Sequence, residues 1–157
     1  MDMSATSQDR NLGDLPEWDL RVFYEGVDDP RIEADLAALC KDVPAFANAY
    51  RGKLNELAGE VTGGDEIAAA IARYEALEDR MGRIASYAGL LFAMSSTVPE
   101  HARFYGDMQT ALTELNSDLL FFGLELNALA DEDIERLADS SDSFRRYLPW
   151  EIGRAHV

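Results

Sequence analysis

Histidine, cysteine and clustered carboxylates are the side chains of this sequence that could take part in chemistry, and they are few. His101 follows Glu100 at the start of an expected helix; it could act as an acid–base residue, but an exposed surface histidine is favoured. Cys40 adjoins an apolar helix face, which favours a buried small residue over a reactive thiol. The acidic segment 131–135 lacks the alternation and the glycine of a calcium loop, so we expect a solvated helix start.

The motifs of common catalytic and ligand sites do not occur in the sequence. It contains no H-E-x-x-H zinc helix, no E-x-x-H pair for a di-iron site and no G-x-x-x-x-G-K phosphate loop. A zinc site needs about three protein ligands, usually rich in His or Cys. The histidines are His101 and His156, and we expect His156 to belong to non-native sequence; one histidine and one cysteine, Cys40, then remain and cannot supply such a set. We therefore assign no catalytic, cofactor-binding or metal-ligating residue.

The composition is that of an acidic, folded chain. With 157 residues, 47% hydrophobic and 28% charged, it is long and apolar enough for one domain with a sizeable core. The net charge of −16 opposes binding to nucleic acid or to an anionic membrane surface, although such a balance most often reflects solubility alone. The single cysteine, the lack of a secretory leader and the lack of a long apolar run lead us to expect a cytoplasmic protein.

Apolar residues recur at alternating steps of three and four in three long segments, which is the spacing of one helical face. We predict an all-α fold, a bundle of three long antiparallel helices plus one or two short helices. The long helices are expected over residues 30–57, 65–94 and 98–129, and the short ones near 131–138 and 144–148.

Several residues mark features within these helices. Asp29 is expected to cap the first helix, with Pro30 at its first position. Pro44 falls inside the same helix and predicts a kink or a short break there. Gly82 and Gly89 lie inside the second helix, where a glycine costs about 1 kcal/mol relative to alanine, and they suggest close approach by a neighbouring backbone.

The chain divides into a tail, one domain and an unusual end. Residues 1–14 are polar and aperiodic, and we expect a disordered tail. Residues 15–150 form the helical domain, to which we expect Trp18 to anchor its irregular first segment because a large indole ring rarely stays in water.

Residues 151–157 are expected to be read-through into a sequencing adapter. Ile152–Val157 back-translate to the start of a common adapter sequence, and Glu151 has a compatible codon. The native sequence would then end at Trp150, and His156 would have no biological meaning. A natural C-terminal tail is the alternative.

Two helical segments, Tyr87–Met94 and Leu119–Leu126, are apolar on more than one side. Because a helix that is apolar all round is buried all round or faces a partner, these segments predict a further layer of protein. The alternative is that the N-terminal tail and the segment around Trp18 provide the cover.

Six segments in order, spanning Leu15 to Trp150, resemble the N-terminal region of oligoendopeptidase F, a relative of the thimet-type zinc oligopeptidases. No single segment is a catalytic signature, but six in sequence are much more specific than one. The segments are "LPEWDLRVFY" (15–24), "YRGKL" (50–54), "RIASYAGLLFA" (83–93), "ARFYGD" (102–107), "LLFFGLELN" (119–127) and "RRYLPW" (145–150).

The resemblance implies an all-helical N-terminal region that forms one wall of a channel for short peptides. In this family an H-E-x-x-H helix in a downstream domain binds zinc and hydrolyses the peptide. The sequence lacks that motif, so none of the family's catalytic or zinc-binding residues can be carried over, and this fragment should be inactive alone. The missing catalytic domain would lie against Tyr87–Met94 and Leu119–Leu126.

Two further interpretations remain beside this one. Tyr74, Tyr87 and Tyr105 could contribute hydroxyls to a peptide channel, but each lies in or beside an apolar stripe, so core packing is favoured. The chain could also be a stand-alone acidic helical module that binds a protein partner through its apolar faces.

Overall fold

The computed structural model describes residues 18–148, and this part of the chain is helical, with no strand, which confirms the all-α class. None of its helices is both long and apolar enough to cross a membrane. The predictions for residues 1–14 and 151–157, including His156, lie outside the described residues. The elements are η1 (Leu20–Val22), α1 (Pro30–Tyr50), α2 (Leu54–Gly59), α3 (Gly63–Met94), α4 (Pro99–Ala128), α5 (Asp131–Ser140) and α6 (Asp142–Arg145).

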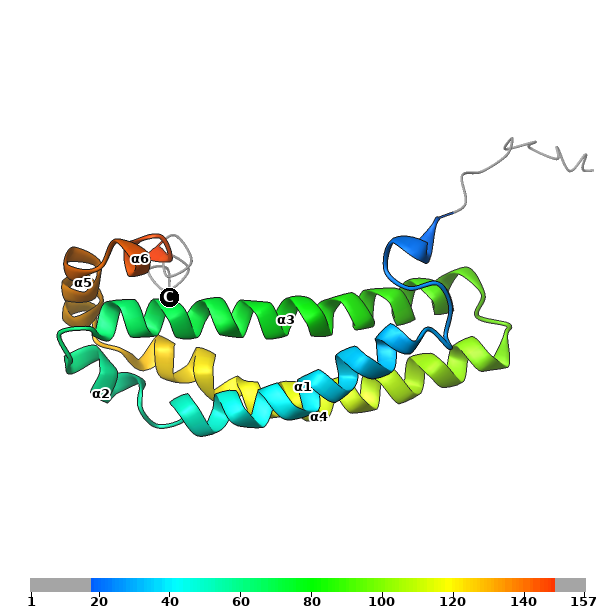
Figure 1. Cartoon of the computed structure of the whole chain (residues 1–157), viewed down its shortest axis with the longest axis horizontal. Helices are drawn as coiled ribbons and strands as arrows, with labels where there is room; N and C mark the ends of the chain where they lie inside the picture. Colours follow the sequence, from blue (N-terminus) through cyan, green and yellow to red (C-terminus); the bar gives the residue numbers. More distant parts are fainter. Residues whose placement is uncertain (1–17, 149–157) are drawn as a thin grey trace, which may run out of the picture.

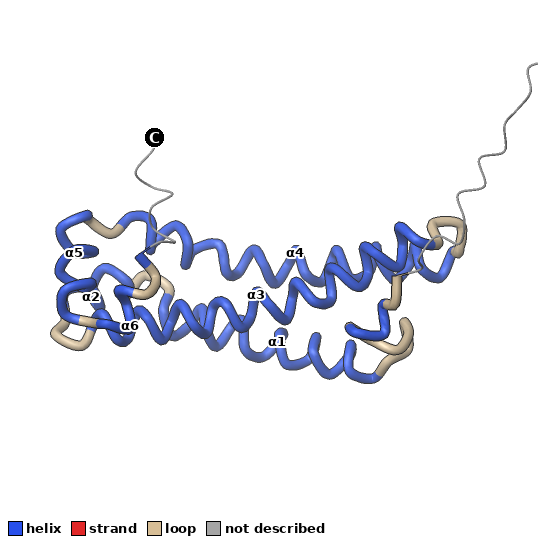
Figure 2. The backbone as a smooth tube through the Cα atoms, turned by 90° about the horizontal axis from the view of Figure 1, so that it is seen from above, coloured by secondary structure: helices blue, strands red, loops and turns tan. Residues whose placement is uncertain are grey.

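The helices build an elongated body (Figure 1). α3 runs back along α1, and α4 runs back along α3, so that each of these three helices contacts the other two. The view from above shows α3 between α1 and α4 (Figure 2). α2, α5 and α6 gather at the end where α3 begins, and η1 lies at the opposite end. The long helices thus form the body, and the short ones close its ends.

The start of the first helix agrees with its sequence, but its end does not. Asp29 is the N-cap and Pro30 is the first helical residue, as predicted. α1 continues through Pro44, so the prediction of a short break there is wrong, and the alternative of a kink at Pro44 stays a prediction. The chain turns instead at Gly52, whose φ of 77° is the left-handed conformation that commonly ends a helix. The carboxylate of Glu125 accepts a hydrogen bond of 2.6 Å from the Gly52 amide, and α2 follows as a separate helix.

The core follows the predicted stripes. Its centre is aromatic: the ring of Phe122 lies 5.0 Å from that of Phe46 and 5.0 Å from that of Tyr74. The apolar spacing of the second long helix extends to Met94, but the Met94 side chain is 47% exposed. The buried stripe residues are Ile32, Leu39, Val43, Phe46, Leu54, Ile67, Ile71, Leu77, Met81, Ile84, Tyr87, Leu115, Leu119, Phe122, Leu126 and Leu129.

The segment before α1 is held to the body by Tyr24 and not by Trp18. The Trp18 side chain is 59% exposed, so the prediction that it anchors this segment is wrong. Tyr24 is buried, packs edge-on against Tyr87 with ring centroids 5.3 Å apart, and donates a hydrogen bond of 2.7 Å to Asp35. A buried tyrosine whose hydroxyl reaches a carboxylate satisfies both its apolar ring and its polar end.

Candidate functional site

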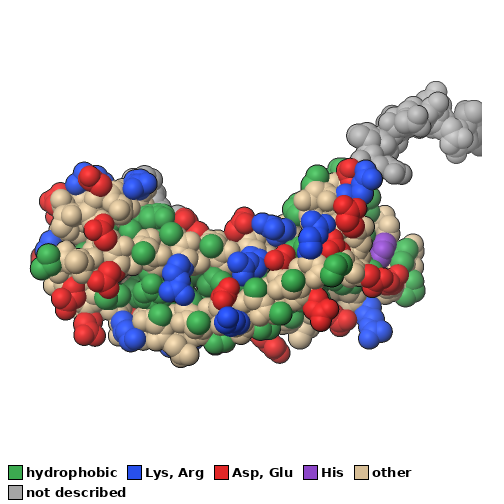
Figure 3. Space-filling view, in the orientation of Figure 1, with side chains coloured by type: hydrophobic (Ala, Val, Ile, Leu, Met, Phe, Trp, Pro, Cys, Tyr) green, Lys and Arg blue, Asp and Glu red, His purple; other side chains and the backbone are tan. Residues whose placement is uncertain are grey.

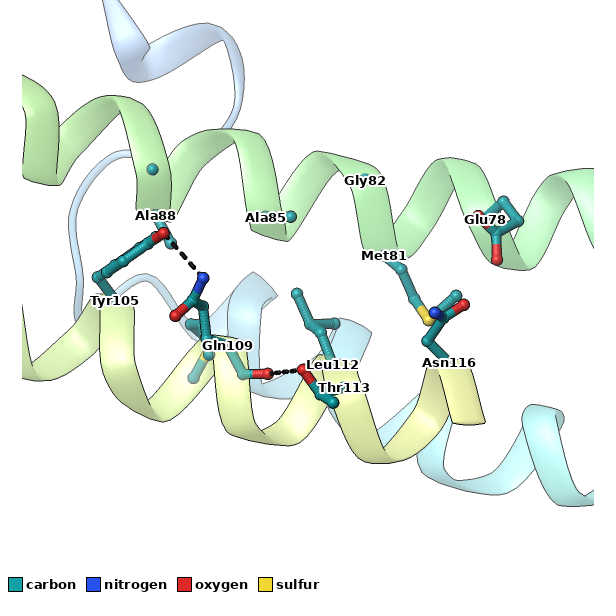
Figure 4. Close-up of a pocket in the computed structure, with 12 residues that line it drawn as sticks. Glu78, Met81, Gly82, Ala85, Ala88, Tyr105, Gln109, Leu112, Thr113 and Asn116 are labelled. Carbon is teal, nitrogen blue, oxygen red and sulfur yellow. Dashed lines mark hydrogen bonds between the residues drawn. The ribbon is translucent and has the colours of Figure 1, made fainter. Parts of the chain in front are cut away.

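An open groove runs between α3 and α4 and is the best candidate for a functional site (Figure 4). Its volume is about 460 Å³, and α1 contributes no residue to its lining. In the close-up, α1 lies behind the α3–α4 pair, so the groove opens on the face that α1 leaves uncovered. The lining residues are Glu78, Met81, Gly82, Ala85, Ala88 and Gly89 from α3, and Tyr105, Met108, Gln109, Leu112, Thr113 and Asn116 from α4.

Small residues make the α3 side of the groove shallow. Gly82, Ala85 and Gly89 are spaced by three and four positions and therefore share one face of the helix. A Cβ atom on Gly82 would meet no atom within 4 Å, and one on Gly89 would lie 3.9 Å from the Tyr105 ring. The close backbone approach predicted at these glycines is therefore wrong among the described residues. The glycines border open space.

The polar groups at one end of the groove satisfy one another. The Gln109 side-chain amide donates a hydrogen bond of 2.8 Å to the Tyr105 hydroxyl, and the Thr113 hydroxyl donates one of 2.7 Å to the Gln109 backbone carbonyl. Phe92 stacks on Tyr105 with ring centroids 5.1 Å apart. This end is already fixed by internal contacts and demands no ligand.

The other end of the groove carries the partly buried carboxylate of Glu78. Its Oε1 atom is buried and accepts no hydrogen bond among the described residues. Burial raises the pKa of the Tyr74 hydroxyl, and the negative charge of Glu78 and a hydrogen-bonding interaction with that side chain raise it further. Asn116 lies across the groove at the same end (Figure 4). A buried carboxylate oxygen that accepts no hydrogen bond costs free energy, because it has lost its hydrogen bonds to water.

The structure does not bring the chemistry-bearing residues singled out in the sequence together. Cys40 is exposed, so its prediction as a buried residue is wrong; its neighbour Leu39 takes the core position of α1. His101 is half-buried rather than exposed, with its Nδ1 atom unpaired. It borders a separate pocket of about 990 Å³ beneath the segment that contains Tyr24. Segment 131–135 forms the acidic first turn of α5, which confirms the solvated helix start.

The three tyrosines differ in their surroundings. Tyr87 is buried, and Tyr74 is half-buried and stacks on Phe122, so the prediction of core packing is confirmed for the first and largely for the second. Tyr105 is half-buried at the edge of the groove. Sequence periodicity could not distinguish these positions, because all three fall on or next to an apolar stripe.

The two apolar segments lie at opposite ends of the α3–α4 pair. Tyr87 packs against Phe104 near one end, with ring centroids 5.9 Å apart, whereas Phe122 stacks on Tyr74 near the other. The positions of Phe104 and Phe122 on α4 are separated by about 27 Å, at about 1.5 Å per residue. The groove is lined by the stretch of α3 and α4 between these two ends, but it opens on the face away from α1, whereas Phe122 and Tyr74 pack on the face toward α1.

Within residues 18–148 the cover over the two apolar segments is partial. Tyr24 follows Trp18 in the segment before α1 and packs on Tyr87, in line with the alternative that this segment provides cover. Phe121 is half-buried under the guanidinium of Arg51, which lies 5.0 Å from the ring centroid. Leu120 and Leu124 are 58% and 70% exposed. They follow Asn116 at steps of four and extend the exposed face beyond the groove.

The groove lining consists mainly of small, apolar and uncharged polar side chains. No group of three or more His, Cys, Asp or Glu side chains within residues 18–148 could hold a metal ion, so these residues do not fit the zinc ion that the family resemblance implies. No protein-family model, curated protein or solved structure matches this chain. The relationship to oligoendopeptidase F therefore stays a prediction from the six sequence segments.

Proposed function

We propose that this chain is the N-terminal helical part of a cytoplasmic zinc metalloendopeptidase that resembles oligoendopeptidase F. In this proposal α1, α3 and α4 form the bundle of three long antiparallel helices expected of that region. The observation that carries the proposal is the ordered set of six segments between Leu15 and Trp150. The groove between α3 and α4, with the exposed Leu120 and Leu124 beyond it, supports the proposal as a surface that a catalytic half would cover.

The proposal divides the work between two halves. The catalytic half carries the H-E-x-x-H helix and its zinc ion, which supplies the activated water. The helices of this chain form one wall of the channel and limit access to short, unfolded peptides. This chain binds no zinc and hydrolyses nothing by itself.

The decisive experiment is to read the source DNA beyond the Trp150 codon. The proposal expects an in-frame H-E-x-x-H downstream, and it expects the complete gene product to cleave a fluorogenic oligopeptide in a zinc-dependent manner. The 157-residue chain, purified free of metal, is the matched control and should cleave nothing. A native stop codon after Val157, or zinc-dependent cleavage by the isolated chain, contradicts the proposal.

A stand-alone acidic helical interaction module is the second candidate. The packing of Tyr24 on Tyr87 favours it, because this contact shows that one apolar segment is partly covered from within the chain. Light scattering and limited proteolysis of the isolated chain separate the candidates. A monodisperse, protease-resistant monomer favours the module, and a chain that aggregates or is rapidly cleaved favours the missing half.

A further inference from the structure

We propose that the groove between α3 and α4 is a docking site for one amphipathic α-helix of a partner protein, with a Lys or Arg placed opposite Glu78. This inference goes beyond the proposed function, because it states the chemistry of the covering element and does not use the zinc site or the peptide channel.

The shape of the groove fits a helix. From Glu78 to Gly89 the groove extends over three turns of α3, or about 16 Å. Gly82 offers open space to an approaching side chain or backbone, and Ala85 next to it is exposed. Packed helices approach to about 8–10 Å between axes, and small side chains at the contact permit the shorter distances. A helix can therefore lie between α3 and α4 without displacing a large side chain of α3.

The apolar side of the docked helix would face Met108 and Leu112. Both residues belong to the predicted core stripe of α4, yet both are only half-buried. The half of α4 that follows has its stripe residues Leu115, Leu119 and Phe122 fully buried. The first half of α4 thus has apolar surface that residues 18–148 do not cover.

Charge identifies the partner. Among the described residues, Glu78 is the one charged side chain in the groove lining, at one end of the groove, and Glu75 lies one turn before it on an exposed position of α3. None of the groove-lining residues among residues 18–148 is Lys or Arg. An ionised donor makes the strongest hydrogen bond to a carboxylate. A second copy of this chain, with its net charge of −16, would bring like charge instead.

The two ends of the groove also orient the helix. Tyr105, Gln109 and Thr113 are joined by hydrogen bonds to one another and carry no charge. The negative charge of the groove is at the end marked by Glu78 and Asn116 (Figure 4). The basic residue of the docked helix therefore lies at this end.

Fluorescence anisotropy with two designed peptides tests the proposal. One labelled peptide of about five helical turns carries Ala and Leu on one face and Lys on its flanks; the other has Glu in place of each Lys. The 157-residue chain should bind the Lys peptide and not the Glu peptide. Ala85→Trp, which fills the groove, should weaken binding at least about tenfold. Glu78→Gln should weaken it about threefold to tenfold and reduce its salt dependence.

Ala37→Trp is the matched control, because Ala37 is an exposed alanine of α1, away from the groove. It should leave binding unchanged, and circular dichroism should show that all three variants retain the helical fold. Equal binding of both peptides, or equal effects of Ala85→Trp and Ala37→Trp, overturns the proposal. A self-association in sedimentation that Ala85→Trp abolishes also overturns it, since the groove would then belong to a second copy.

Discussion

The two faces of the α3–α4 pair are built from the same two helices. They differ in the size of their side chains and in whether another helix packs over them. On the face toward α1, Phe122 packs between Phe46 and Tyr74, and the guanidinium of Arg73 lies 5.8 Å from the ring centroid of Phe46. The side of the molecule drawn in Figure 3 mixes both signs of charge with apolar side chains. On the other face, glycine and alanine border an open groove.

The comparison shows that apolar periodicity in a helix specifies which side chains can be buried. It does not specify whether another element packs over them. Large rings on the α1 face fill the space between three helices and are dry. The opposite face has the same periodicity, but it leaves Met108 and Leu112 half-buried and Leu120 and Leu124 exposed. Cover by another element decides the outcome.

Substitution of one residue from each face of α4 should give the largest difference. Phe122→Ala removes a fully buried ring at the centre of the aromatic cluster and should lower the free energy of unfolding by about 3–5 kcal/mol. Leu124→Ala, two positions further on the same helix, should change it by less than about 0.5 kcal/mol because that side chain is 70% exposed. Urea unfolding followed by circular dichroism measures both. Similar costs for the two variants would show that Leu124 is covered in solution.

A smaller effect is expected where a glycine meets a neighbouring element. A Cβ atom on Gly64 would lie 2.5 Å from the Ser141 Cβ and 3.2 Å from the Leu137 carbonyl oxygen. Gly64→Ala should therefore destabilise the protein by about 1–3 kcal/mol, the range seen for overpacking. Thermal unfolding measures the change. A neutral result would mean that the end of α5 is loosely held against α3.

Gly82→Ala tests the groove face by the same measurement and should have the opposite sign. A Cβ atom there meets nothing within 4 Å, so the gain in helix propensity, up to about 1 kcal/mol, should appear as added stability. Loss of stability in this variant would indicate that part of the chain outside residues 18–148 already occupies the groove.

The smallest effect is expected at the start of α1, the helix that covers one face of the α3–α4 pair. The hydrogen bonds from the Arg31 side chain and the Glu25 amide lower the pKa of the Asp29 carboxyl well below its ordinary value of 3.8. Since the folded pKa is lower than the unfolded one, this carboxylate stabilises the fold above about pH 4, and the stabilisation is lost as the pH falls below that value.

Asp29→Asn should reduce this acid sensitivity while keeping a side chain that can cap the helix. Urea unfolding at neutral pH and at about pH 3 gives the comparison. The unsubstituted chain should lose more free energy of unfolding between the two conditions than the variant does. Equal losses would show that Asp29 does not titrate differently in the folded state.

Much of the fold could be predicted because helix periodicity and capping are local. The stripe from Ile67 to Tyr87 and the cap at Asp29 follow from neighbours in the sequence. The expected end of the first helix at residue 57 is wrong because the apolar spacing continues through Leu54 and Leu57, which lie in the separate helix α2. The glycine one position past the helix C-cap was the available signal, and a proline with an exposed position in α1 is tolerated.

The groove could not be predicted in the same way. Gly82 and Gly89 were visible in the sequence, but a glycine on a helix face is compatible both with a close neighbour and with open space. Which of the two holds depends on the path of α1 over the pair, a long-range property. The exposure of Cys40 and the anchoring by Tyr24 instead of Trp18 likewise depend on how distant segments meet.

The carboxylate of Glu125 that holds the corner between α1 and α2 has a consequence for synthesis. It accepts from the amides of Gly52 and Leu54 at 2.6 and 3.5 Å, and it lies 73 residues after Gly52 in the chain. A ribosome adds about 5–20 residues per second, so the acceptor is made roughly 4–15 s after these donors. During that interval the two amides lack the acceptor that they have in the folded chain, and the corner can reach its final form only after this part of α4 has been made.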